Sequence, residues 1–151
     1  MTPSTYDPRR DEHPVAPALR GLGELTLVGS RAFDPWLKFA TAESDWDYYL
    51  VLKTPGGYNP LKDLGFVPLA GGGPYGADGE IAGIWRLPEH TAYGRTWAAV
   101  DLIVCSADVA ARRLPVLERI TRMGRRGGEL CRGIKSEAAW GAFWFATRGA
   151  P

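Results

Sequence analysis

The sequence Val-Asp-Leu-Ile-Val at residues 100–104 places one acid inside an otherwise apolar run. The longer stretch 97–105 has the composition of a buried β-strand. A carboxylate is costly to bury unless it is paired or coordinates a metal ion. Asp101 is therefore the residue whose partners the rest of the chain has to supply.

Two more acids stand close together in Ser-Asp-Trp-Asp-Tyr at residues 44–48. The stretch 45–52 predicts a second strand, and residues i and i+2 of a strand share a face, so Asp45 and Asp47 project together. Carboxylates this close repel each other, and a divalent cation removes the conflict. If this strand lies beside 97–105, Asp101 completes a three-carboxylate site. Such oxygen ligands suit Mg²⁺ or Mn²⁺.

A Gly-Ser turn precedes the acids in the sequence. Residues 25–28 predict a short buried strand, which ends at Gly29-Ser30. Glycine lets the backbone approach a ligand closely, and N–H groups at such a turn can bind phosphate. The Ser30 hydroxyl can donate one more hydrogen bond. Arg31 and Lys38 are nearby candidates for offsetting phosphate charge.

The remaining pattern predicts an α/β (α+β) domain, with a small mixed sheet and helices packed mainly on one face. Another strand is expected at 81–86. Asp108 is expected to cap a helix that Pro115 interrupts. A Gly-rich segment at 71–79 is interpreted as a connector rather than a lid. The expected helices cover 36–42, 59–64, 109–123 and a terminal stretch from 136.

Bulk composition indicates one globular domain. The chain has 151 residues, and residues 1–20, rich in proline and charge, are expected to form a flexible arm before a domain at 21–151. The net charge of +1 favours neither nucleic acid nor membrane as a partner. The expected location is the cytoplasm, because no run reaches transmembrane length and no signal pattern opens the chain. The oligomeric state is left open.

Other chemistry-bearing residues have structural interpretations beside functional ones. Basic residues crowd 112–135, which is either a solvated helix face or a phosphate-facing patch. Trp85 and Trp97 are expected in the core. His13 falls in the arm and His90 in a surface loop, so neither is given a catalytic role.

The order Gly29-Ser30, then Asp45 and Asp47, then Asp101 resembles the polymerase-β-type nucleotidyltransferase superfamily. The resemblance covers roughly 25–149 and is closest to small stand-alone nucleotidyltransferase-like proteins of tailed bacteriophages, which would place the chain in a host cytoplasm. It implies that the Gly-Ser turn holds nucleotide phosphates, that all three acids bind metal, and that Asp101 also helps to deprotonate the acceptor hydroxyl. The stretch 31–44 is longer than is usual in that family.

The implied activity is transfer of an NMP from an NTP, such as ATP, to an acceptor hydroxyl with release of pyrophosphate. The acceptor would be RNA, a protein or a small molecule. The alternative is a catalytically inactive module of the same fold that binds a nucleotide or a protein, with an antitoxin-like or host-interaction role. A phosphohydrolase is disfavoured because Gly29, not a nucleophilic aspartate, follows the first strand.

Overall fold

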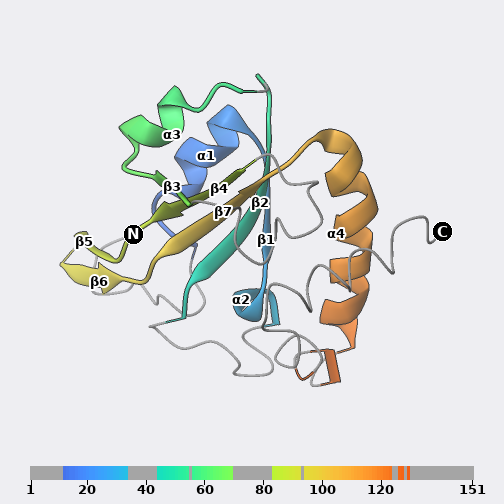
Figure 1. Cartoon of the computed structure of the whole chain (residues 1–151). Coiled ribbons are helices and arrows are strands. Elements are labelled where there is room, and N and C mark those ends of the chain that lie inside the picture. Colours follow the sequence, from blue (N-terminus) through green and yellow to red (C-terminus); the bar gives the residue numbers. More distant parts are fainter. Residues whose placement is uncertain are drawn as a thin grey trace.

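The computed structural model describes residues 12–33, 44–54, 56–69, 83–92 and 94–123, with 126, 127 and 129. Five strands form one sheet in the order β1-β2-β7-β4-β3, and β5 pairs with β6 separately (Figure 1). The strands are β1 Gly23–Val28, β2 Trp46–Leu52, β3 Val67–Leu69, β4 Gly83–Leu87, β5 His90–Ala92, β6 Arg95–Trp97 and β7 Val100–Val104. The predicted class, an α+β domain with a small mixed sheet, is confirmed.

Strand β7 is the centre of the sheet, and all five of its residues are buried. It runs parallel to β2 and antiparallel to β4, while β1 pairs antiparallel with β2. Successive side chains of a strand point to opposite faces. A central strand that is buried on both faces therefore needs a covering layer on both sides of the sheet.

Each face of the sheet carries its own apolar cluster. On one face, α1 (Ala16–Leu22) and α3 (Asn59–Asp63) pack on Tyr48, Leu50 and Leu102. On the other, α4 (Ala107–Arg122) packs on the side of Tyr49 and Ile103 (Figure 1). Helices were expected mainly on one face. Two do share a face, and α4 lies on the other, where it helps to bury Ile103 of β7.

The expected arm at 1–20 is wrong for the residues from 12 onward. Helix α1 begins at Ala16, and the side chains of Ala16 and Leu19 are completely buried against the sheet. Apolar residues three apart lie on one side of a helix, so this short segment has a face to bury despite its prolines. Residues 1–11 lie outside the described residues.

Helix α4 differs from its expected form at two points. Its N-cap is Ser106, whose side-chain oxygen accepts a hydrogen bond from the Val109 N–H at 3.3 Å, and not Asp108. Asp108 instead lies in the first turn, where an acid interacts favourably with the helix dipole. The helix continues through Pro115 without ending there.

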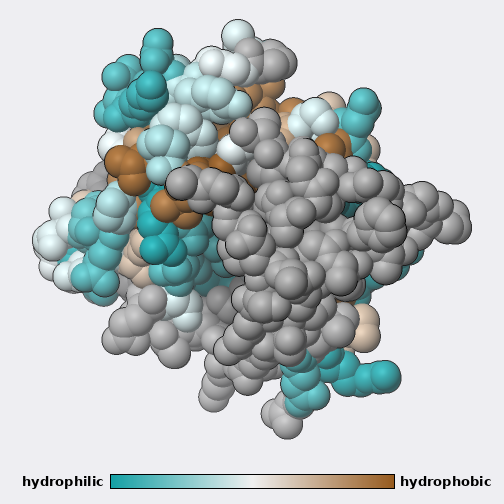
Figure 2. All heavy atoms as spheres, viewed as in Figure 1, coloured by the Kyte–Doolittle hydropathy of each residue, from teal (hydrophilic) through white to brown (hydrophobic). Residues whose placement is uncertain are grey.

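The short helix α2 (Ser30–Phe33) directly follows β1 and the Gly29 turn. Among the described residues, no helix is long and apolar enough to cross a membrane. The coloured surface in Figure 2 mixes hydrophilic areas with smaller apolar ones, and the large apolar side chains found exposed in the described ranges are Val67, Leu69 and Met123. The expected helices at 36–42 and from 136, and the 71–79 segment, lie outside the described residues.

Candidate functional site

The candidate site is a row of side chains that crosses neighbouring strands. Asp47 of β2 is the register partner of Asp101 of β7, and Asp101 is the register partner of Arg86 of β4. Register partners in adjacent strands point to the same face. The predicted neighbourhood of the 45–52 and 97–105 strands is thus confirmed, and both acids share the α4 face with Tyr49 and Ile103.

Arg86 is the partner that buried Asp101 requires. Its Nε donates to Asp101 Oδ1 at 2.7 Å, and its Nη2 donates to Asp101 Oδ2 at 3.0 Å. This two-point contact is the strong geometry for arginine and carboxylate. The hydrogen bonding to Asp101 is the main reason that the pKa of Arg86 is raised. Sequence reasoning missed this residue, although an arginine between Trp85 and Leu87 in an expected strand was a usable signal.

Asp45 joins the same guanidinium from the segment just ahead of β2. Its Oδ2 accepts a hydrogen bond from Arg86 Nη2 at 2.9 Å, and its side chain stays 44% exposed. Partial burial raises the pKa of the Asp45 carboxyl, with the charge of Arg86 acting in the opposite direction and that of Asp101 adding to the rise. Arg86 therefore bridges two of the three predicted acids.

Asp47 is the acid with the most strongly perturbed ionisation. Burial raises the pKa of its carboxyl to about 8, and the negative charges of Asp101 and Asp45 add to the rise. Arg86 and Arg31 oppose this effect but do not cancel it. Although Arg86 brings one positive charge into the cluster, a negative charge on Asp47 beside those of Asp45 and Asp101 remains unfavourable.

The Gly29 turn lies directly against Asp47. Val28 is the register partner of Asp47, and a Cβ placed on Gly29 would lie 2.5 Å from Asp47 Oδ2. Gly29 also has a φ of +75°, in the left-handed region where glycine carries no steric penalty. The predicted proximity of the turn to Asp47 is confirmed, and a side chain at position 29 would have to displace the Asp47 carboxylate.

Replacing Gly29 with alanine is therefore expected to destabilise the fold by two separate effects. The positive φ costs about 1 kcal/mol for a residue with a Cβ, and contact with the Asp47 carboxylate adds to that. Gly94→Ala is the matched control, since Gly94 has a φ of +71° with nothing within 4 Å of its Cβ position. Urea unfolding should show a larger decrease in the free energy of unfolding for Gly29→Ala than for Gly94→Ala. Equal decreases would contradict the close contact between position 29 and Asp47.

The predicted phosphate-binding residues have different outcomes. Arg31 is only 3% exposed, and its Nε and Nη2 donate to the Ser44 carbonyl at 3.0 and 2.7 Å. Its guanidinium lies 4.0 Å from the centre of the Trp46 ring. This buried position argues against the predicted phosphate contact. Ser30 is the first residue of α2, and Lys38 lies outside the described residues.

The three acids do not form a ready metal cage. In the described ranges, no group of three or more His, Cys, Asp or Glu side chains is arranged to hold a metal ion. The Arg86 guanidinium instead forms ion pairs with both Asp101 and Asp45. The donor set still fits a hard divalent ion, because it consists of carboxylate oxygens. The raised pKa of Asp47 also indicates that further positive charge would be favourable.

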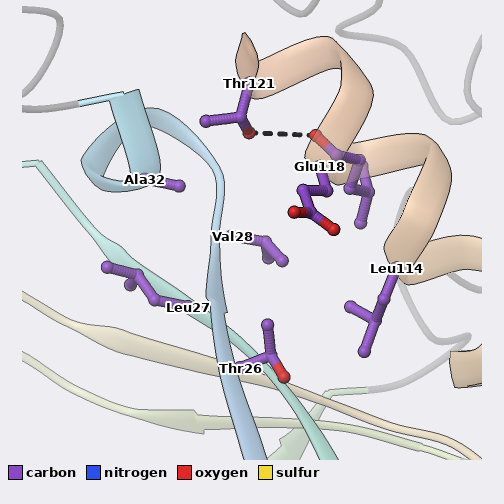
Figure 3. A pocket seen from close by; sticks show the side chains of 8 residues that line it. Thr26, Leu27, Val28, Ala32, Leu114, Glu118 and Thr121 are labelled. Carbon is purple, nitrogen blue, oxygen red and sulfur yellow. Dashed lines mark hydrogen bonds between the residues drawn. The ribbon is translucent and has the colours of Figure 1, made fainter.

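A mainly apolar pocket of about 340 Å³ lies next to this row, between β1, α2 and α4. In Figure 3, Val28 and Leu114 approach each other across it, and Thr121 donates a hydrogen bond to the Leu117 carbonyl at 2.9 Å. Val28 connects the pocket to the site through its pairing with Asp47. Its lining residues are Thr26, Leu27, Val28, Ala32, Leu114, Leu117, Glu118 and Thr121.

The sequence predicted that His13 lies in a flexible arm, and this prediction is wrong. The residue is 1% exposed. Its ring contacts those of Trp46, Trp97 and His90, with centroids 5.9, 5.1 and 5.3 Å away. The Val15 N–H donates to His13 Nδ1 at 3.0 Å, so the neutral ring carries its proton on Nε2. Burial is the main cause that lowers the pKa of His13 to about 3, and His90 and Arg31 contribute.

Trp97 is fully buried and Trp85 nearly so, which confirms their expected place in the core.

Comparison of the chain with protein-family models, with curated proteins and with solved structures returned no match.

Proposed function

We propose that the protein is a metal-dependent nucleotidyltransferase of the polymerase-β type, which moves an NMP from an NTP to an acceptor hydroxyl. The supporting observation is that Asp47 and Asp101 are paired across β2 and β7 while the Gly29 turn touches Asp47. A phosphate-binding turn and an acid cluster from separate segments are needed in one place for this chemistry.

Each element of the site has a part in the proposed reaction. Asp45, Asp47 and Asp101 would hold Mg²⁺ or Mn²⁺, which supplies charge neutralisation for the phosphates and the leaving pyrophosphate. The turn at Gly29 offers backbone N–H groups to the triphosphate. Asp101 accepts the proton of the acceptor hydroxyl. The hydroxyl oxygen then forms a bond to the α-phosphorus, and the bond from that phosphorus to pyrophosphate breaks.

The test is transfer of label from NTPs that carry radioactive α-phosphate, in the presence of Mg²⁺ and of cellular RNA or protein from cytoplasmic lysate. Wild-type protein should label an acceptor and release pyrophosphate. Asp101→Asn should lower the rate at least about 100-fold, as expected for loss of a general base. Asp63→Asn, at an exposed position in α3, is the matched control. Label transfer that survives both Asp101→Asn and the Asp45→Ala/Asp47→Ala pair would refute the assignment.

The second candidate is a non-catalytic module that binds a nucleotide or a protein. The ion pairs of Arg86 with Asp101 and Asp45 favour it, because they satisfy two of the acids without any metal. A thermal shift with ATP and Mg²⁺ and no transfer to any acceptor would support this alternative. Pyrophosphate release that depends on Asp101 would exclude it.

A further inference from the structure

The Arg86 guanidinium lies where a metal ion would have to contact Asp101 and Asp45. We propose that Arg86 is an internal cation that competes with divalent metal for these two acids and keeps the site closed until it is displaced. The inference rests on the proposed function only in that the acids bind a metal. It adds a regulatory contact that the acid motif alone does not contain.

The competition follows from how many oxygen atoms Arg86 uses. Its Nε and Nη2 contact both carboxylate oxygens of Asp101, and Nη2 also contacts Asp45 Oδ2. A hard cation would bind through the same oxygens. Asp101 cannot satisfy the guanidinium at both oxygens and a metal ion at full strength together, so binding of one weakens binding of the other.

Arg86 is also the member of the ion pair that can leave. Its side chain is 39% exposed, while that of Asp101 is 13% exposed. Arginine has a long side chain that keeps its charge in water. The guanidinium can therefore turn toward solvent while the backbone of β4 stays paired with β7. Asp101, in the buried central strand, has no comparable freedom.

The first experiment measures Mn²⁺ binding without nucleotide, from the electron paramagnetic resonance signal of the free ion. Arg86→Gln should bind Mn²⁺ at least about tenfold more tightly than the wild type, a difference of about 1.4 kcal/mol. Arg86→Lys should fall between the two, because an ammonium group cannot form the two-point contact. Arg119→Gln, at an exposed position of α4, should match the wild type. Adding Asp101→Asn to Arg86→Gln should remove the gain.

The second experiment needs no variant and covers the case in which Arg86→Gln does not fold. The ¹⁵N–¹H signal of the Arg86 Nε–H group should shift when Mg²⁺ is added to wild-type protein, as its contact with Asp101 is lost. Equal Mn²⁺ affinity of the wild type and a folded Arg86→Gln, a gain that persists with Asp101→Asn, or an Nε–H signal that ignores Mg²⁺ would each overturn the inference. Because neither experiment contains an NTP, failure to transfer label would count against the proposed function alone.

Discussion

Asp47→Asn is expected to raise the free energy of unfolding at pH 8 by at least about 2 kcal/mol while it removes the proposed nucleotide transfer. Burial disfavours the negative charge of the Asp47 carboxyl, and the charges of Asp101 and Asp45 add to this effect. A tenfold change in an ionisation equilibrium corresponds to about 1.4 kcal/mol. An asparagine of the same size cannot ionise, so the variant escapes this penalty. Functional sites often carry such a loss of stability.

The pH dependence of this effect has a definite sign. The pKa of Asp47 is raised from 3.8 to about 8 in the folded protein. Between those values the folded state retains a proton that the unfolded state has lost. The free energy of unfolding must therefore fall as the pH rises from about 4 to 8. This contribution should be absent in Asp47→Asn.

Urea unfolding at pH 5 and pH 8 measures the effect directly. The gain in stability of Asp47→Asn over the wild type should be larger at pH 8, because the free-energy penalty at this carboxyl grows with each pH unit between the unfolded and folded pKa values. Asp63→Asn, on the exposed surface of α3, should show no comparable gain at either pH. If Asp47→Asn were less stable than the wild type at pH 8, the Asp47 carboxylate would have a favourable partner and the crowded-acid interpretation would be wrong.

The sequence predicted the positions of Asp47 and Asp101 because the alternation of side chains along a strand can be recognised locally. Asp47 and Asp101 each interrupt a strand-like stretch, and the two buried strands pair as expected. The proximity of Gly29 to Asp47 also follows, because β1 ends where the acid-bearing strand begins. These relations need only the alternation of strands and the order of the chain.

Arg86, by contrast, depends on register. Its meeting with Asp101 requires β4 to pair with β7 at one particular offset, and a shift by one residue would turn its side chain to the other face. No local pattern specifies that offset. Arg31 was predicted to contact phosphate because it follows the turn. In the structure it contacts the Ser44 carbonyl and the Trp46 ring instead. These groups are distant from Arg31 in the sequence, and only folding brings them close to it.

His13 is expected to make the fold sensitive to acid, in the direction opposite to Asp47. Its pKa is lowered from 6.5 to about 3, mainly by burial. Between these values the unfolded chain binds a proton that the folded protein excludes, so the free energy of unfolding falls as the pH drops below about 6.5. From pH 7 to pH 4 the loss from this group is about 3 kcal/mol.

The two contributions overlap, and this decides how the His13 effect has to be measured. As the pH falls from 6.5 to 4, the Asp47 contribution raises the free energy of unfolding while the His13 contribution lowers it. The wild type can therefore show little net change. The Asp47→Asn background removes one of the two. In that background the loss on acidification should be fully visible, and a further His13→Phe change should nearly abolish it.

His13→Phe is suited to this test because it keeps an aromatic ring beside Trp46 and Trp97 without a titrating group. It also removes the acceptor for the Val15 N–H, so some stability will be lost at every pH. That loss shifts the whole curve, whereas the titration changes its slope between pH 7 and pH 4. A slope that stays steep in the double variant would mean that a group other than His13 causes the sensitivity to acid, and the assignment to His13 would be wrong.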